Sequence, residues 1–495
     1  MSKGNFVSSY TILRFAWNNI LSTISFAIAV IVFFERGNMR PGLEGLFLLP
    51  AVFGFCIQIF NRYYLYSRGG LALKIFFFIM FIRYDIVPFL IALTKGSYNT
   101  LPITMPMISA SYNGYVFAII MSIVESFVCF GAISYYSRRI ENEKLIQKYQ
   151  ESRKSNLGVS AVGLIGLLFF VFILLTRNLH QVFSTFTFFT INEKYENPNT
   201  DAFGILAIQV IKMFVFMLLT IYFHKKYNQK KNPIWVLCAV VVAFFNMAIF
   251  FGYNRSFVLQ TSIATIYVLY SFFPRYRKLL VGGLIPVCAL IMVSMIFIKQ
   301  FGVSYTESTQ DPLNIAQLAN TIECYVGGPW SLASGYDAYR AHGELLSFFT
   351  FFKDFILNCF VSYMPGLEFT LELFPNTVSS PVIHQMYTHS YQMLPLSATT
   401  LFYGGIILGP IISVLFYVFI MKFLVLFDYK SKLSRDIFKK YLYTLIAVLI
   451  SFTMCYTWVT LLWSFTKNIL FISLLVLVNE IHMVRNGKIK RTRTF

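Results

Sequence analysis

Charged residues are scarce in this chain. They make up 13% of its 495 residues, about half of the share found in soluble globular domains. Hydrophobic residues reach 57%, and the mean hydropathy is +0.65. This composition excludes an ordinary soluble domain and indicates a polytopic membrane protein. The 55 Phe and 31 Tyr suit the lipid-facing surfaces and interfacial belts of such a protein.

Several signatures of soluble catalysis and metal binding are also missing. The seven Cys form neither a CxxC pair nor a CxxH cluster, so we expect no zinc site and no disulfide framework. A single bond between Cys324 and Cys359 remains an open alternative. The sequence has no HExxH, Walker loop, GxSxG or DxD nucleotide-sugar signature. An energy source or activated donor must therefore come with the substrate or from an ion gradient.

Apolar runs bounded by charged or turn residues predict about twelve transmembrane helices. We expect an all-α polytopic membrane protein in three parts: spans 1–9 within residues 1–298, a long external loop at 299–398, and spans 10–12 with a basic cytoplasmic tail in 399–495. Within the loop, residues 345–364 are expected to form an amphipathic or re-entrant helix at the outer interface. The approximate span limits are 16–34, 45–60, 71–94, 114–136, 157–176, 204–223, 234–252, 256–273, 279–298, 399–421, 441–462 and 467–483.

Lys and Arg fall mainly on one side of this topology. With the N-terminus in the cytoplasm, 29 of the 41 lie in cytoplasmic segments or at the span ends next to them, and 10 lie in or next to external segments, while Arg83 and Lys212 lie within spans. The positive-inside rule then places both termini in the cytoplasm. The net charge of +20 is therefore a topology signal, and no nucleic acid is expected as a partner. Contacts of the basic runs with membrane lipid would add little.

The stretch "FIRYDIVPFL" (81–90) places two charges inside the third predicted span. Arg83 and Asp85 each cost at least about 2.5–3.5 kcal/mol there unless they are paired or hydrated. They are two residues apart, so they point to different sides of a helix. Pro88 lacks an N–H and favours a kink or opening at the carbonyl of Tyr84. Two readings stay open: a buried ion pair, for example Arg83 with Glu125, or an anion-binding pocket that contains Arg83.

A second feature is the predicted external turn "FFGYNRSFVLQTSI" (250–263), whose single cation is Arg255. A lone Arg at a short outer turn runs against the positive-inside bias. It would either snorkel to outer headgroups or present its planar fork to a phosphate or diphosphate.

The long loop holds the third feature. The stretch "IECYVGGPWSLASGYDAYRAHGE" (322–344) combines aromatic rings with carboxylates, which suits a sugar-handling surface. Interfacial aromatics are also common without any sugar. Further on, "YTHSYQMLPLSATTLFYGGIILGP" (387–410) offers a His whose pKa suits general-base work. The candidate residues are Tyr325, Trp330, Tyr336 and Tyr391 for sugar binding, Glu323, Asp337 and His389 for catalysis, and Arg340 beside Arg83 and Arg255 for diphosphate binding.

Taken together, these stretches resemble the bacterial O-antigen polymerase and ligase superfamily, most closely the oligosaccharide repeat-unit polymerases of the Wzy type. Arg83, Tyr84 and Pro88 look like the Arg-Tyr…Pro segment of an early span. "GYNRSFVL" is similar to the short Ser-Arg turn of the family, with Arg255 as the Arg and Asn254 in place of Ser. "THSYQ…GGIILG" looks like the His-Asn…Gly-x-x-Gly segment, with His389 as the His, Ser390 in place of Asn, and the glycines spaced one residue wider. "YVGGP" resembles a tyrosine-glycine segment of such polymerases.

This resemblance implies a GT-C-like integral-membrane glycosyltransferase in the bacterial plasma membrane. Such an enzyme joins undecaprenyl-diphosphate-linked oligosaccharides at the outer face, for O-antigen or capsule synthesis. It implies no cofactor, nucleotide sugar or metal, and a chain-length regulator protein as a candidate partner. Arg255 and Arg83 would stabilise the leaving diphosphate, and His389 or Asp337 would act as base.

Two other functions share these sequence features. An O-antigen ligase performs the same transfer onto a different acceptor, and the sequence barely separates it from a polymerase. A flippase for lipid-linked oligosaccharides, or another secondary transporter, would also have about twelve spans and buried charges. Transporters usually show internal repeats and short loops, whereas this chain shows no clear repeat and has a long 299–398 segment, which favours an enzyme.

Overall fold

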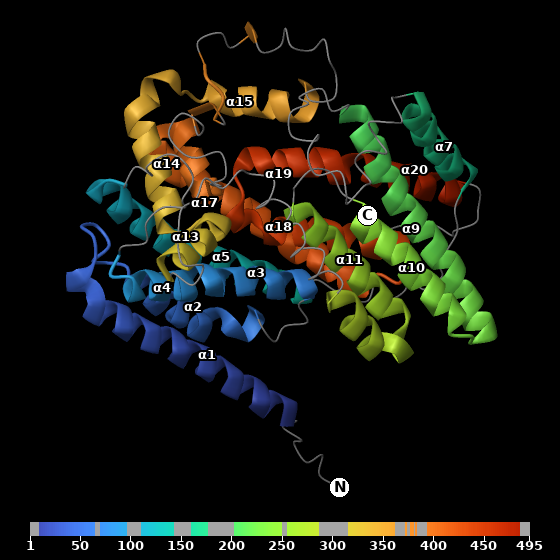
Figure 1. The fold of residues 1–495 in the computed structure, drawn as a ribbon, viewed down its shortest axis with the longest axis horizontal. Coiled ribbons are helices and arrows are strands. Elements are labelled where there is room, and N and C mark those ends of the chain that lie inside the picture. Colours follow the sequence, from blue (N-terminus) through green and yellow to red (C-terminus); the bar gives the residue numbers. More distant parts are fainter. Residues whose placement is uncertain are drawn as a thin grey trace, which may run out of the picture.

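The computed structural model describes residues 9–64, 70–96, 110–142, 160–176, 202–249, 255–286, 315–361, 372–373, 377–380, 382–383 and 394–485. Within these ranges the regular elements are all helices, with no strand. The described chain is therefore all-α, as the sequence predicts (Figure 1).

Five helices make up the N-terminal part of the described chain; the first four lie at the lower left in Figure 1, and the fifth runs into the middle of the molecule. They are α1 (Ser9–Phe34), α2 (Leu48–Tyr64), α3 (Leu71–Phe81), α4 (Val87–Leu93) and α5 (Tyr112–Asn142). Helices α1 and α2 pack side by side, and α2 also packs on α5. Helices α3 and α4 form one continuous rod that is joined by a π-helical segment, η2 (Ile82–Ile86). This segment contains the charges of the third predicted span.

A second group follows in α7 (Ala161–Thr176), α9 (Ala202–Lys230), α10 (Ile234–Ala248) and α11 (Arg255–Phe272). Helix α9 packs against both α7 and α10, and α11 packs on α10. Figure 1 shows α7, α9, α10 and α11 on the opposite side of the molecule from α1 and α2.

The predicted external loop contains helices that pack into the body. They are α13 (Ile315–Val326), α14 (Pro329–His342) and α15 (Phe349–Ile356), which continues as the π-helical η5 (Leu357–Val361). Helix α14 lies against α5 and α17, and most of its residues are buried. The predicted helix at 345–364 is therefore confirmed as helical at 349–361, and its position at the outer interface stays a prediction.

The C-terminal part corrects two predicted span limits. Helix α17 (Leu396–Leu433) is longer than the predicted tenth span and bends at Gly405, whose φ is +68°. Helix α18 (Ile437–Ser451) ends well before residue 462. After the short turn η7 (Thr453–Cys455), the chain continues through α19 (Trp458–Phe465), η8 (Thr466–Leu470) and α20 (Phe471–Arg485). The turn between the last two predicted spans lies at 452–457, so Lys467 is inside a helix.

Six of the described helical segments are long and apolar enough to cross a membrane. They are Asn19–Asn38, Leu71–Leu93, Tyr112–Ile140, Leu206–Lys230, Leu396–Leu433 and Trp458–His482. Four shorter apolar helices accompany them, at Leu48–Phe60, Ala161–Thr176, Ile234–Ala248 and Val258–Phe272. The chain is thus a polytopic, membrane-embedded helical protein. The predicted ninth span lies mostly outside the described residues, because the structure describes it only as far as residue 286.

Candidate functional site

The third span carries a buried Arg at the point where its helix widens. Pro88 has no N–H to donate to the carbonyl of Tyr84, so the regular α-helical bonding is interrupted there. The chain forms the π-helical segment Ile82–Ile86 just before Pro88, and Arg83, Tyr84 and Asp85 are all buried in it. Single π-turns of this kind occur frequently at functional sites.

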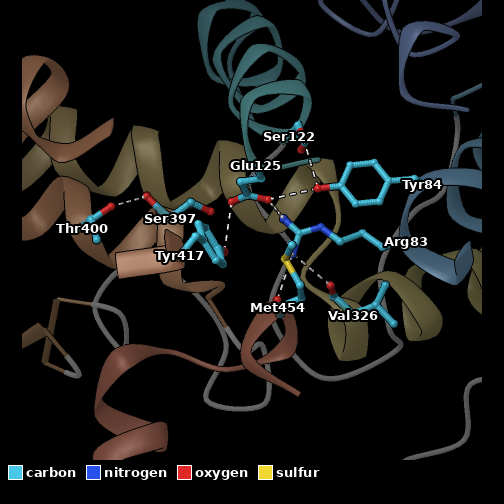
Figure 2. Close-up of polar contacts among 9 residues, drawn as sticks. All are labelled: Arg83, Tyr84, Ser122, Glu125, Val326, Ser397, Thr400, Tyr417 and Met454. Atoms are coloured by element: carbon cyan, nitrogen blue, oxygen red, sulfur yellow. Dashed lines mark hydrogen bonds and ion pairs between the residues drawn. The ribbon is translucent and has the colours of Figure 1, made fainter. Parts of the chain in front are cut away.

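Arg83 forms an ion pair with Glu125 of α5, with 2.8 Å between Nη2 and Oε2. Figure 2 shows that two tyrosine hydroxyls also donate hydrogen bonds to this carboxylate. Tyr84 donates its hydroxyl to Oε2 at 3.3 Å and Tyr417 of α17 donates to Oε1 at 3.2 Å. The hydroxyl of Tyr84 also lies 3.1 Å from the carbonyl oxygen of Ser122. Three helical segments are therefore tied together through one carboxylate, and the pairing of Arg83 with Glu125 is confirmed.

The other terminal nitrogen of Arg83 donates to two backbone carbonyls, each at a point where a helix is interrupted. Nη1 donates to the carbonyl oxygen of Met454 at 2.9 Å and to that of Val326 at 3.4 Å (Figure 2). Met454 lies in the turn between α18 and α19, and Val326 ends α13. Such carbonyls lack an intrahelical donor, so Arg83 stabilises two interrupted helices at once.

Gly327 allows these segments to come close together. Its φ is +64°, in the left-handed region that favours glycine. A Cβ at this position would lie 2.9 Å from the carbonyl oxygen of Met454 and 3.0 Å from Cβ of Pro395, which precedes α17. The "YVGGP" stretch thus brings the ends of α13, α18 and α17 to the guanidinium of Arg83.

Of the three guanidinium nitrogens, Nε is the one without a hydrogen bond to a described residue, although Arg83 is only 1% exposed. Buried donors are almost always paired, so an unused N–H marks a place where a ligand oxygen or water would be favoured. Chemically, the arrangement is a fixed guanidinium that is paired with Glu125 and whose Nε–H has no partner among the described residues.

Asp85 is not part of this cluster. Its Oδ2 accepts a hydrogen bond from the hydroxyl of Ser25 on α1 at 2.8 Å. The expectation that Arg83 and Asp85 point to different sides of the helix is therefore confirmed, and each finds its own partner on a different neighbouring helix.

Two predicted catalytic carboxylates bind helix N-termini in this structure. Asp337 of α14 accepts the backbone N–H of Ser111 at 2.7 Å and its hydroxyl at 2.5 Å, directly before α5. Glu323 of α13 accepts the backbone N–H of Trp330 in the first turn of α14. Carboxylates at helix N-termini satisfy unpaired N–H groups and favour the helix dipole. Both contacts stabilise the packing of α13 and α14 in the body.

The predicted sugar-binding aromatic residues occupy different environments. Trp330 is 6% exposed and belongs to the core, whereas Tyr325 is 48% exposed. Tyr336 is half-buried and stacks on Phe117 of α5, with 5.0 Å between the ring centroids. Arg340 is exposed near the end of α14. Of these residues, Tyr325 and Arg340 therefore offer the most accessible side chains.

The remaining predicted site residues fall at or beyond the limits of the described chain. Arg255 begins α11, but its side chain lies outside what the structure describes. His389 and Tyr391 also lie outside the described residues, as does the segment 250–254. Their predicted roles stay predictions.

Sequence reasoning missed the contributions of Tyr417 and Met454. Tyr417 resembles the many other aromatic residues of the spans, so composition does not single it out. Met454 contributes its backbone carbonyl, which no residue pattern marks. The one useful signal was the glycine pair at 327–328, because such a pair permits close backbone approach.

No family model, curated protein or solved structure matches this chain.

Proposed function

We propose that this chain is a polysaccharide polymerase that joins undecaprenyl-diphosphate-linked oligosaccharide repeats at the outer face of the bacterial plasma membrane. The observation that carries the proposal is the fully buried Arg83, held with an unused N–H at the meeting point of interrupted helices. Irregular backbone at membrane depth is tolerated where it is buried in protein or lines a cavity. A cation in such a place suits an anionic substrate.

The proposed topology supports an outward-facing site. It puts both termini and most Lys and Arg in the cytoplasm, so the turn at 452–457 and helices α13 and α14 belong to the outer side. Arg83 contacts both Met454 in that turn and Val326 at the end of α13. The buried cation would then be reached from the side where lipid-linked repeats are polymerised.

In the proposed reaction, a hydroxyl of the incoming repeat attacks the anomeric carbon of the growing chain. The bond between that carbon and the diphosphate oxygen breaks, and the polyprenyl diphosphate leaves with the bonding electrons. The hydroxyl proton passes to a base. Arg83 and Arg255 would stabilise the leaving diphosphate, with Arg340 as a third candidate cation.

The base is best assigned to His389 within this proposal. Its pKa range suits proton transfer near neutral pH. Asp337, the other candidate, already accepts two hydrogen bonds from Ser111. Proton transfer to Asp337 would compete with these contacts, so Asp337 is better suited to hold α14 on α5.

A deletion strain of the source bacterium tests the function directly. For a polymerase, surface-polysaccharide profiling should show loss of the long-chain ladder with a single repeat still attached. Loss of all repeats from the lipid core would instead indicate a ligase, which uses the same transfer chemistry. Total loss of surface repeats would indicate a flippase, and an unchanged profile would exclude all three.

Two variants then test the chemistry in the complemented strain. Arg255→Lys should shorten the ladder strongly, because Lys keeps the charge but loses the planar fork. His389→Ala should lower turnover while the protein still binds the lipid-linked donor. Full activity in both variants would remove both residues from the mechanism.

A further inference from the structure

A basic pocket lies where α11 and α17 end and α18 begins. Its volume is about 440 Å³, within the range of small-ligand sites. Three cations line it: Lys432 and Arg435, which are exposed at its rim, and Lys440, which is buried. By the predicted topology this end of the helices faces the cytoplasm, on the opposite side of the membrane from the proposed transfer site.

The turn between α17 and α18 shapes this pocket. Ser434 is extended, with φ −62° and ψ 132°, and its N–H donates to the carbonyl oxygen of Lys430 at 2.9 Å. Asp436 is also extended and caps α18 by accepting the N–H of Phe438 at 2.8 Å. This short, well-bonded turn fixes the positions of Lys432 and Arg435 relative to α18.

Lys440 is the deepest cation of the pocket. It is 7% exposed, and its Nζ forms neither a hydrogen bond nor an ion pair with any residue of the described chain. It lies over the rings of Tyr267 and Phe272, at 5.4 and 5.9 Å from their centroids. A buried ammonium without a carboxylate partner is costly. An anion in the adjoining pocket would offset this cost.

The carboxylates of the surrounding elements lie outside the pocket and bind other groups, and Asp428 also attracts the charge of the pocket residue Lys432. Asp428 accepts the N–H groups of Gly70 and Ala72 at 2.5 and 2.9 Å, and so caps α3. Glu480 pairs with Lys439 at 2.5 Å, and Asp436 caps α18 as described. None of these carboxylates lines the pocket. Arg277, which follows the 3-10 turn Pro274–Tyr276 after α11, adds a further positive charge close enough to act on Lys440.

We propose that this pocket binds a phosphate group, either in the headgroup of an anionic lipid or in a free phosphate compound. The guanidinium of Arg435 and the two ammonium groups supply charge-assisted donors. Ser271 and Ser434 also line the pocket, but their hydroxyls donate to the backbone carbonyls of Tyr267 and Asp436. Phe272 and Leu433 provide an apolar wall beside them. Basic pockets between transmembrane helices on the cytoplasmic side are typical of phospholipid headgroup sites.

The experiment uses the purified full-length protein in detergent, with phosphatidylglycerol as the probe and phosphatidylcholine as the neutral comparison. Native mass spectrometry would measure the bound lipid. The test variant is Lys432→Gln with Arg435→Gln, both at exposed positions that tolerate substitution. The matched control is Lys422→Gln with Lys430→Gln, which removes the same charge from α17 outside the pocket. Lys440→Met is a third variant that keeps the packing on Tyr267 and Phe272.

We expect wild type and control to bind phosphatidylglycerol alike and to prefer it to phosphatidylcholine. Affinity should fall about fivefold for each pocket charge removed, hence roughly twenty-five-fold in the double variant. If phosphatidylglycerol stays bound in millimolar inorganic phosphate, the pocket binds the phosphate of a lipid headgroup. If inorganic phosphate displaces the lipid, the pocket binds a free phosphate compound. Equal binding of both lipids, or equal binding by the pocket and control variants, would overturn the proposal.

Discussion

Glu125 holds the guanidinium of Arg83 inside the helical body, with 2.8 Å between Oε2 and Nη2 and both side chains at most 1% exposed. The pair joins the π-helical segment of the third span to α5, and through Tyr417 also to α17. A buried pair of this kind is costly to break, because the remaining partner becomes an uncompensated charge. In the proposed mechanism, the same pair holds the cation in place for the anionic substrate.

Glu125→Ala should lower the free energy of unfolding by about 3–5 kcal/mol, because Arg83 would remain buried without its carboxylate. Thermal unfolding of the purified protein in detergent measures this. The double variant Arg83→Met with Glu125→Gln should recover much of that stability, since no net charge is left buried. It should still fail to make long-chain polymer. Normal polymer in the double variant would reduce Arg83 to a packing role.

Gly327→Ala should destabilise the protein by about 1–3 kcal/mol through its left-handed backbone alone. The added Cβ would also push on the Met454 carbonyl oxygen, 2.9 Å away. Gly131→Ala is the matched control, because a Cβ there meets nothing within 4 Å. Its effect on the unfolding temperature should be small. Equal unfolding temperatures for the two variants would contradict the close approach at Gly327.

Asp354 of α15 makes the stability depend on pH. Burial raises the pKa of its carboxyl to about 6, although hydrogen bonds from Ser380 and Tyr403 oppose the shift. Because the folded state holds this proton more tightly than the unfolded state, protonation stabilises the fold. The contribution, about 2–3 kcal/mol, is complete below the unfolded pKa of about 3.9 and is lost as pH rises through about 6.

The measurement is the unfolding temperature between about pH 4 and pH 7 for wild type and Asp354→Asn. The variant should lose the part of the pH dependence that falls in this window. Glu344→Gln, at an exposed position nearby, is the control and should follow wild type. Parallel pH profiles for wild type and Asp354→Asn would show that the group titrates normally.

Asp337→Ala should lower the free energy of unfolding by about 1–2 kcal/mol, the usual effect of removing a carboxylate or hydroxyl cap. The loss is expected because Ser111, directly before α5, loses its hydrogen-bond acceptor. Asp337→Asn, which keeps an acceptor oxygen, should lose less and retain polymer synthesis. If Asp337→Asn folds as wild type but makes no polymer, Asp337 is the base and His389 is not.

The topology prediction is tested by single cysteines at two exposed positions, Arg340→Cys and Lys230→Cys, in a chain whose accessible native cysteines are replaced. A membrane-impermeant maleimide should label position 340 in intact cells and position 230 only after permeabilisation. Labelling of both positions from the same side would exclude the predicted twelve-span topology.

The sequence alone determined the class of this protein and the approximate position of most helices. Helix formation across a membrane depends on the local apolar run, since every backbone group must be bonded within the segment. Low charge and long apolar stretches therefore predicted an all-α polytopic chain, and Arg83 with Pro88 marked the irregular third span. The break at 452–457 was missed, because "FTMCYT" has no charged residue, Pro or Gly to mark a turn.

Only the tertiary structure decided which groups these charges meet. Arg83 contacts a carbonyl 371 residues away in the chain, and no local pattern encodes such a distance. The same holds for Asp337, a candidate base in the predicted external loop, whose carboxylate the fold places against Ser111 at the start of α5; its catalytic role stays a prediction. Carboxylates serve equally well as bases and as caps, so the role follows from the N–H groups that packing brings within hydrogen-bonding distance.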